Sequence, residues 1–238
     1  AADLGEHIDV LRELCVDHQV VLVHGGGKAI ARLQEQLRLE PRFVEGLRVT
    51  DDASLDVAEM VLSGLINKRL VAQLVSAGIA ALGVSGVDSG ILRVVKMKHR
   101  EADLGWVGEI TETNQAPIET LLTARIVPII SPISLGLDGH TYNVNADHAA
   151  AALSCALLAD ELVFVTDVPG VLTRDHQECI PVLWPEQIEV LIASQTISGG
   201  MVPKVRSALS ALAQGVSNVR ITNLAGLATE GGTCFRSA

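Results

Sequence analysis

The sequence lacks the long apolar runs, the basic charge excess and the closely spaced cysteines that mark several classes of protein. No stretch approaches the ~20 consecutive apolar residues that a membrane-spanning helix needs. No basic-then-apolar leader is seen at the start of the sequence. We therefore expect a soluble, cytoplasmic protein with no membrane as a partner.

The charge balance is acidic, with 28 aspartates and glutamates against 18 lysines and arginines and a formal net charge of -10. Binding of nucleic acid needs basic patches that neutralise phosphates, so no nucleic acid is expected as a partner. A nucleotide is not excluded, because local amides, lysines and Mg²⁺ can hold a small anion. Cys15, Cys155, Cys179 and Cys234 form no CxxC pair, which predicts free thiols rather than a disulfide framework or a metal site.

The hydrophobic pattern alternates between short strands and amphipathic helices. Strands are expected at Val20–Val23, Ile79–Val84, Ile126–Ile130, Glu161–Thr166 and Asn218–Thr222, and helices at residues 4–15, 30–37, Ser54–Ser76, Ile118–Thr123, Ala146–Leu158, Pro185–Ala193 and Val202–Gln214. Alternation between Ile91 and Thr113 indicates antiparallel strands, and Asp138-Gly139 indicates a hairpin. Strands that alternate with helices predict an α/β fold whose mostly parallel sheet is covered on both faces.

A run of three glycines, Gly25 to Gly27, stands between the first strand and the next helix. Without side chains, its backbone N–H groups can approach a ligand closely, and the helix that follows adds its positive end. A tight turn is the alternative, although one glycine would satisfy it. The sequence has no GxGxxG at this turn and no GxxxxGK[ST] anywhere, which weighs against a dinucleotide-binding dehydrogenase and excludes a P-loop NTPase.

Two polar segments contrast with their apolar surroundings. Arg48, in Gly46–Thr50, could hold a carboxylate bidentately, although a surface salt bridge is the commoner role of an arginine. Asn143, Asn145 and Asp147 stand at the head of an alanine-rich helix. One such residue would suffice as a helix cap, and this segment supplies three.

Two later segments carry further candidates. Thr166, Asp167 and Gly170 follow a predicted strand, where a carboxylate could meet nucleotide hydroxyls or support a metal site. The segment Ser198–Lys204 is a helix entry with two glycines and one lysine, and Lys204 could reach back toward a phosphate. A solvated lysine is the alternative.

Taken together, these segments resemble the amino-acid kinase family, and within it the members that phosphorylate N-acetyl-L-glutamate. The matching stretches are Val23–Gly27, Phe43–Asp51, Asn67–Leu70, Gly83–Gly90, Leu104–Ile110, Tyr142–Asp147, Val165–Leu172 and Ile197–Val205. They follow the family's order over almost the whole chain. The resemblance implies a three-layer αβα sandwich with two lobes, residues 1–145 for the acylated amino acid and for dimerisation, and residues 146–238 for ATP.

The resemblance also implies a reaction, in which ATP with Mg²⁺ phosphorylates the side-chain carboxylate of N-acetyl-L-glutamate in arginine biosynthesis. It assigns catalytic roles to Lys204, Asp147 and Gly26, acceptor binding to Gly26, Gly27, Arg48, Asn143 and Asn145, and nucleotide binding to Thr166, Asp167, Gly170, Gly200, Met201 and Lys204. The resemblance implies no metal site formed by the protein's own residues. The expected assembly is a homodimer or a dimer-based hexamer.

Two alternatives remain open at the level of sequence. The chain could be a kinase for an aminoadipate or glutamate held on a carrier protein, or a non-catalytic, ligand-sensing relative. Family members open with a strand that bears a Lys-x-Gly-Gly motif, and we expect that strand to precede Ala1 in the natural protein.

Overall fold

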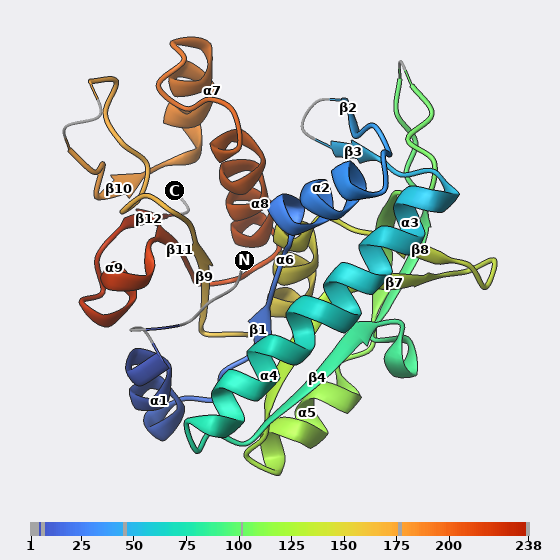
Figure 1. The fold of residues 1–238 in the computed structure, drawn as a ribbon. Coiled ribbons are helices and arrows are strands. Elements are labelled where there is room, and N and C mark those ends of the chain that lie inside the picture. Colours follow the sequence, from blue (N-terminus) through green and yellow to red (C-terminus); the bar gives the residue numbers. More distant parts are fainter. Residues whose placement is uncertain (1–4, 6–7, 45–46, 101, 176–177, 237–238) are drawn as a thin grey trace. The chain divides into compact units, whose positions relative to one another are not determined.

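The computed structural model describes residues 5, 8–44, 47–100, 102–175 and 178–236 of the chain. Contacts between residues divide the chain into two compact units, Ala1–Ala149 and Ala150–Ala238, which we call the N-terminal and C-terminal units. Each unit has its own sheet (Figure 1). Each also has its own hydrophobic core. Within the described ranges, no helix is both long enough and apolar enough to cross a membrane.

The N-terminal unit is built on a mostly parallel sheet. Its described strands are β1 (Leu22–Val23), β4 (Ala81–Gly86), β5 (Leu92–Lys96), β6 (Gly108–Thr113), β7 (Val127–Gly136) and β8 (Thr141–Asn143). Strand β7 is central, because β1, β4 and β5 all pair with it in parallel. β6 pairs antiparallel with β5, and β8 pairs antiparallel with β7. The ends of β1 and β4 therefore lie beside a buried strand that holds them in register.

Helices pack against this sheet and supply most of its core. They are α1 (Ile8–Asp17), α2 (Gly27–Gln36), α3 (Asp52–Glu59), α4 (Asn67–Ser76) and α5 (Ala116–Thr123), with a π-helix η2 (Met60–Ile66) between α3 and α4 and a 3-10 turn η3 (Asp88–Gly90). α3, η2 and α4 run on as one long helix (Figure 1). Apolar side chains of α2 and this long helix cluster with Val127, Ile129 and Ile133 of β7. A separate hairpin, β2 (Arg42–Val44) and β3 (Leu47–Val49), carries Arg48.

The long helix has defined ends. At its start, the Asp51 carboxylate accepts a hydrogen bond from the Ser54 N–H at 2.9 Å, which caps the first turn. At its end, Gly78 has a φ of +82°, and the Ile79 N–H donates to the Leu74 carbonyl at 2.9 Å. This is the geometry in which glycine commonly ends a helix, because a left-handed residue there carries no Cβ.

The C-terminal unit is built on a second sheet with the strand order β10-β12-β11-β9. Its elements are the greater part of α6 (Ala146–Ala156), then β9 (Glu161–Val165), β10 (Val182–Leu183), α7 (Pro185–Ala193), α8 (Met201–Ala213), β11 (Asn218–Thr222), α9 (Leu224–Ala228) and β12 (Thr233–Phe235). β9 pairs with β11 in parallel, and β12 runs antiparallel to β11. Alternate residues of β9 and β11 are buried in a core that α7 and α8 share.

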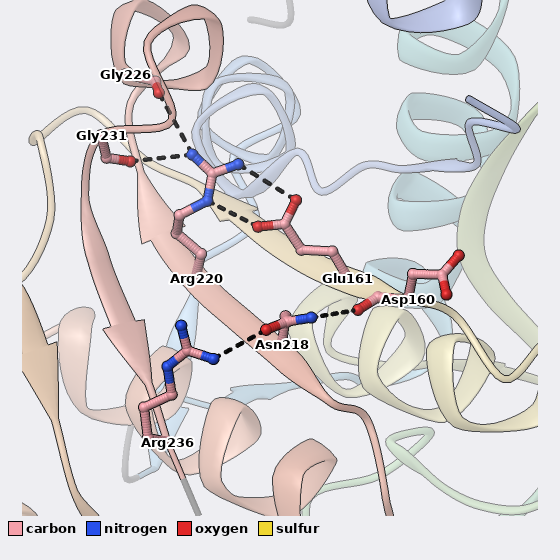
Figure 2. A network of polar contacts seen from close by, with 7 residues as sticks. All are labelled: Asp160, Glu161, Asn218, Arg220, Gly226, Gly231 and Arg236. Carbon is pink, nitrogen blue, oxygen red and sulfur yellow. Dashed lines mark hydrogen bonds and ion pairs between the residues drawn. The ribbon is translucent and has the colours of Figure 1, made fainter. Parts of the chain in front are cut away.

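A buried arginine ties several parts of the C-terminal unit together. Figure 2 shows Arg220 of β11, whose Nε lies 2.8 Å and whose Nη2 lies 3.3 Å from the two carboxylate oxygens of Glu161 on β9. Its Nη1 donates to the carbonyls of Gly231 at 3.1 Å and Gly226 at 3.4 Å. One guanidinium therefore joins two strands to the segment that contains α9.

The prediction of an α/β fold with mostly parallel strands is confirmed. The predicted bounds of α7 and β11 agree with the structure, as do the antiparallel pair β5–β6 and the hairpin at Asp138-Gly139. The described strands, however, are divided between two larger sheets rather than forming one. The division of the two lobes between acceptor and ATP stays a prediction.

Other expectations need correction. The helix predicted at Ser54–Ser76 contains η2, which apolar periodicity does not reveal. Strand β7 continues six residues beyond the expected end at Ile130, because its later residues pair with β8 and β5. Pro132 lies where the register against β4 shifts between Ser131 and Ser134. Leu4, the first residue of the predicted first helix, lies outside the described residues.

Candidate functional site

The glycine loop lies where β1 gives way to α2. His24, Gly25 and Gly26 connect the two elements, and the Gly26 carbonyl accepts from the N–H groups of Ala29 and Ile30, each at 2.9 Å. Among the described residues, no oxygen accepts from the N–H groups of Gly26 and Gly27. A helix start with unused amides and a positive dipole end is suited to an anion.

The glycines of this loop differ in what surrounds them. A Cβ on Gly26 would lie 2.4 Å from Ile66 Cδ1 and 2.7 Å from Leu62 Cδ2, so the π-helix packs directly on this residue. A Cβ on Gly27 would meet no atom within 4 Å. A side chain at Gly26 would therefore displace two buried apolar side chains, whereas the space at Gly27 is open.

Arg48 lies beside the glycine loop. Its Nη2 donates to the Gly27 carbonyl at 3.3 Å, and its Nη1 donates to Gln34 Oε1. Gln34 is fully buried and donates in turn to Ser54 Oγ at 3.0 Å. The guanidinium also stacks 4.6 Å from the centre of the Phe43 ring, and its partial burial lowers the pKa of Arg48. A side chain held by three neighbours in this way is preorganised to bind an anion at the loop.

Asn143 is joined to Arg48 through Thr50. Asn143 Nδ2 donates to Thr50 Oγ1 at 3.3 Å, and the Thr50 hydroxyl donates to the Arg48 carbonyl at 2.9 Å. The backbone reinforces this contact, since the Trp106 N–H donates to the Thr50 carbonyl at 2.7 Å and the Asn143 N–H donates to the Trp106 carbonyl at 2.9 Å. The two polar segments singled out in the sequence therefore lie together, although 93 residues separate Thr50 from Asn143.

The remaining acceptor-side candidates begin helix α6. Asn145 Oδ1 accepts from the N–H groups of Asp147 at 2.8 Å and His148 at 3.3 Å, so the Asn145 side chain caps the helix. Helix capping is the role that the sequence offered as an alternative to ligand binding. Asp147 is the second residue of α6. Burial lowers the pKa of His148, with the nearby carboxylates of Asp147 and Glu109 acting in the opposite direction.

In the C-terminal unit, Thr166 and Asp167 follow the last residue of β9. The Thr166 N–H donates to the Thr222 carbonyl at 2.8 Å, which holds this segment at the ends of β9 and β11. Gly170 is required by packing, because a Cβ there would lie 2.4 Å from Cys179 Sγ and 2.7 Å from Thr233 Oγ1. Thr166 and Asp167 thus lie at the edge of a parallel strand pair where α/β folds commonly bind ligands.

The start of α8 carries the other nucleotide-side candidates. Gly199 has a φ of +55°, and a Cβ on Gly199 or Gly200 would meet no atom within 4 Å. Met201 is the first residue of α8, and Lys204 lies one turn along. Lys204 Nζ is 5.8 Å from the centre of the Phe164 ring on β9. Within this unit, Lys204 therefore lies toward the end of β9, where Thr166 and Asp167 follow.

Three residues that hold this arrangement were given no role from the sequence. Thr50 and Trp106 lie inside matching stretches, which was the available signal, whereas nothing in the sequence marks Gln34. Gly46, which precedes the Arg48 strand, lies outside the described residues. The structure thus places Arg48 and Asn143 in one bonded network with the glycine loop.

Comparison with known proteins gives one consistent set of relatives. Residues 2–223 match the amino acid kinase family. The chain is 56% identical to an acetylglutamate kinase of Roseiflexus castenholzii over 88% of this chain and 80% of that protein. It is 47% identical to an acetylglutamate kinase of Methanopyrus kandleri over 98% of this chain and 97% of that protein.

Solved structures share the fold. The structure of smu.665 from Streptococcus mutans superposes with a TM-score of 0.88 at 30% identity, over 98% of this chain and 92% of that chain. Carbamate kinase from Giardia lamblia bound to AMP-PNP superposes with a TM-score of 0.68 at 16% identity, over 98% of this chain and 88% of that chain. The second likeness concerns the fold alone.

Proposed function

The chain belongs to the amino acid kinase family, and on that premise we propose that it phosphorylates the side-chain carboxylate of N-acetyl-L-glutamate with ATP. A carboxylate oxygen attacks the γ-phosphorus, the bond to the β-γ bridging oxygen breaks, and the products are N-acetyl-L-glutamyl 5-phosphate and ADP. This is an acetylglutamate kinase reaction of arginine biosynthesis, the activity for which the relatives at 47% to 56% identity are named.

One observation carries the proposal for the acceptor. Arg48 contacts the glycine loop at the Gly27 carbonyl and is linked through Thr50 to Asn143. A guanidinium suits the α-carboxylate of the acceptor, and the Asn143 amide suits the acetamido group, since an amide both donates and accepts. The Gly26 and Gly27 N–H groups would then face the reacting carboxylate and the transferring phosphoryl group.

The chemistry needs no general base. The acceptor carboxylate is ionised at neutral pH, so positioning and electrostatic stabilisation supply most of the catalysis. Burial lowers the pKa of His24, which keeps the ring beside the glycines neutral. A neutral imidazole there adds no positive charge, so the backbone amides and Arg48 are the groups that bind the anionic parts of the substrates.

The C-terminal unit supplies residues for the nucleotide. The open glycines Gly199 and Gly200, the positive end of α8 and the Lys204 ammonium are suited to phosphates. Asp167 is a carboxylate ligand of the kind that Mg²⁺ uses together with nucleotide phosphates, and this ion needs no protein cage of its own. When bound, Mg²⁺ would neutralise phosphate charge. We also expect a homodimer or a dimer-based hexamer.

The test measures acyl phosphate, trapped as its hydroxamate, with ATP and each of N-acetyl-L-glutamate, glutamate, aminoadipate and a carrier-bound aminoadipate. Turnover is expected with N-acetyl-L-glutamate. Arg48→Lys should lower kcat/KM for this acceptor about ten- to hundredfold, because lysine cannot form the bidentate pair. Arg42→Lys, on the exposed strand β2, is the matched control and should leave kcat/KM unchanged. Turnover with none of the acceptors, or only with carrier-bound aminoadipate, would refute the proposal.

A further inference from the structure

A buried polar cluster lies beneath the glycine loop and has been given no role so far. His24 and Asn67 are 8% and 1% exposed, and Asn67 Nδ2 lies 3.3 Å from His24 Nε2. The same nitrogen lies 2.9 Å from the carbonyl oxygen of Ile129 on β7 and 3.3 Å from that of Val84 on β4, so its two hydrogens are shared among three acceptors. Lys68 Nζ donates to Asn67 Oδ1 at 3.1 Å and to the Gly83 carbonyl at 2.9 Å. The cluster thus links His24 to β7, which pairs with β1, and to β4, which pairs with the other edge of β7.

The partners of His24 determine its tautomer. His24 Nδ1 lies 3.2 Å from the Gly25 carbonyl oxygen, which can only accept, so the proton is on Nδ1. Because Lys68 donates to the Asn67 oxygen, the Asn67 amide nitrogen is the atom that faces His24 Nε2. A neutral ring with its proton on Nδ1 leaves Nε2 as the acceptor toward this nitrogen. Each ring nitrogen has one defined partner, and the ring orientation is set by both.

The contact with Gly25 also sets the direction of an N–H group. The peptide group between Gly25 and Gly26 is planar and trans, so its carbonyl and its N–H point in opposite directions. Glycine has more rotational freedom than other residues, so without a restraint this peptide group could turn about its flanking bonds. A fixed Gly25 carbonyl therefore fixes the direction of the Gly26 N–H.

We propose that His24 and Asn67 are positioning residues that aim the Gly26 N–H at the acceptor. The inference rests on the proposed function, in which this N–H faces the reacting groups. His24 holds the Gly25 carbonyl from the side opposite the ligand. Asn67 holds His24, and the strand carbonyls with Lys68 hold Asn67. Neither His24 nor Asn67 needs to contact the substrate.

The π-helix explains how Asn67 reaches this place. η2 ends at Ile66, and Asn67 is the first residue of α4. Ile66 contacts the loop at Gly26, and the next residue along the helix contacts it at His24. A π segment changes the direction of the side chains that follow it and is frequent at functional sites. Here it brings two consecutive side chains against one loop.

Three substitutions of His24 test the proposal. His24→Asn keeps an N–H at the Nδ1 position that can donate to the Gly25 carbonyl, whereas His24→Gln keeps an acceptor near the Nε2 position that can bind Asn67. His24→Leu keeps neither. We expect His24→Asn to retain the larger part of kcat, and both His24→Gln and His24→Leu to lose about ten- to hundredfold, since small misplacements of catalytic groups have effects of this size. The KM for ATP should change little in all three.

The kinetic pattern separates positioning from packing. Equal losses of kcat in the three variants, in line with equal decreases in their unfolding midpoints, would overturn the proposal. Absence of activity in the wild-type protein would refute the proposed function instead. In that event the NMR experiment that follows still tests the geometry, because it needs no turnover.

NMR of wild-type protein labelled with ¹⁵N in histidine and glycine should show His24 as a single neutral tautomer with the proton on Nδ1. In Asn67→Ala, the Nε2 partner is lost, and we expect exchange between tautomers together with a shift of the Gly26 amide resonance. A wild-type spectrum with the proton on Nε2, or an Asn67→Ala spectrum identical to that of the wild type, would overturn the inference.

Discussion

Gly26 and Gly27 are adjacent, yet different physical constraints act on them. A side chain at Gly26 would require the terminal methyl groups of Leu62 and Ile66 to shift, whereas the position at Gly27 is open. A glycine that packing does not require is the better indicator of a ligand, because close approach of the ligand to the backbone then explains it. The two residues together allow binding to be separated from stability.

We predict that Gly27→Ala leaves the free energy of unfolding within about 0.5 kcal/mol of wild type, because the methyl group enters open space. Its kcat/KM for the acceptor should fall about hundredfold, since the methyl group lies where the reacting carboxylate would approach. Gly26→Ala should lose about 1–3 kcal/mol of stability through overpacking against the π-helix. Urea unfolding measures the stability of both variants, and the hydroxamate assay measures their kcat/KM. Full activity in Gly27→Ala would contradict the binding role of this amide.

The acceptor site could be predicted from sequence only in part. The glycine run and Arg48 stand out because their residue types are unusual in an apolar segment, and Asn143 stands out beside the helix it precedes. Thr50 joins Asn143 to the Arg48 backbone and Gln34 holds the Arg48 guanidinium, and neither contact can be read from the residue type. Such links depend on tertiary contacts, and hydrophobic periodicity carries no information about them.

At the scale of elements, segments with a clear apolar pattern were predictable and the shortest strands were not. α7 has a helical apolar period, and β11 is a five-residue segment buried at four consecutive positions. The predicted bounds of both agree with the structure. β2, β10 and β12 have two or three residues each, too few for a period to be recognised. Tertiary partners position such short elements, as Arg220 does for the segment that contains α9.

Arg220 allows the contribution of such a partner to be measured. We predict that Arg220→Met lowers the stability of the C-terminal unit by about 2 kcal/mol, because two backbone carbonyls and Glu161 lose a charged donor. Glu161 is 42% exposed and can regain water, so the larger loss typical of a fully buried pair is not expected.

The matched control is Arg236→Met, whose exposed side chain makes one hydrogen bond to Asn218 at 3.0 Å (Figure 2). It should change stability by no more than about 0.5 kcal/mol. The two tryptophans, Trp106 and Trp184, lie in different units. A Trp106→Phe background therefore leaves Trp184 fluorescence as a reporter of the C-terminal unit during urea unfolding. Equal effects of the two substitutions would show that the Arg220 network adds no stability of its own.

At the scale of the whole molecule, the candidate residues separate by unit. The glycine loop, Arg48 and Asn143 belong to the N-terminal unit, whereas Asp167 and Lys204 belong to the C-terminal unit. Each unit has its own core, so a ligand that binds one unit should stabilise that unit first. The proposed binding of the acceptor to the N-terminal unit and of the nucleotide to the C-terminal unit can therefore be tested without measuring turnover.

We predict that hydrogen exchange will map the two ligands to different units. N-acetyl-L-glutamate should slow exchange at residues 24–28, 47–50 and 143–145, and ADP with Mg²⁺ should slow exchange at residues 165–168 and 198–204. At one hundred times its dissociation constant, a ligand stabilises the state that binds it by about 2.7 kcal/mol, or about hundredfold in exchange governed by opening of that state. Glutamate, which lacks the acetyl group, is the control and should protect the N-terminal unit far less. Protection of the glycine loop by ADP alone, with none at residues 198–204, would reverse the assignment, because the nucleotide would then bind where we place the acceptor.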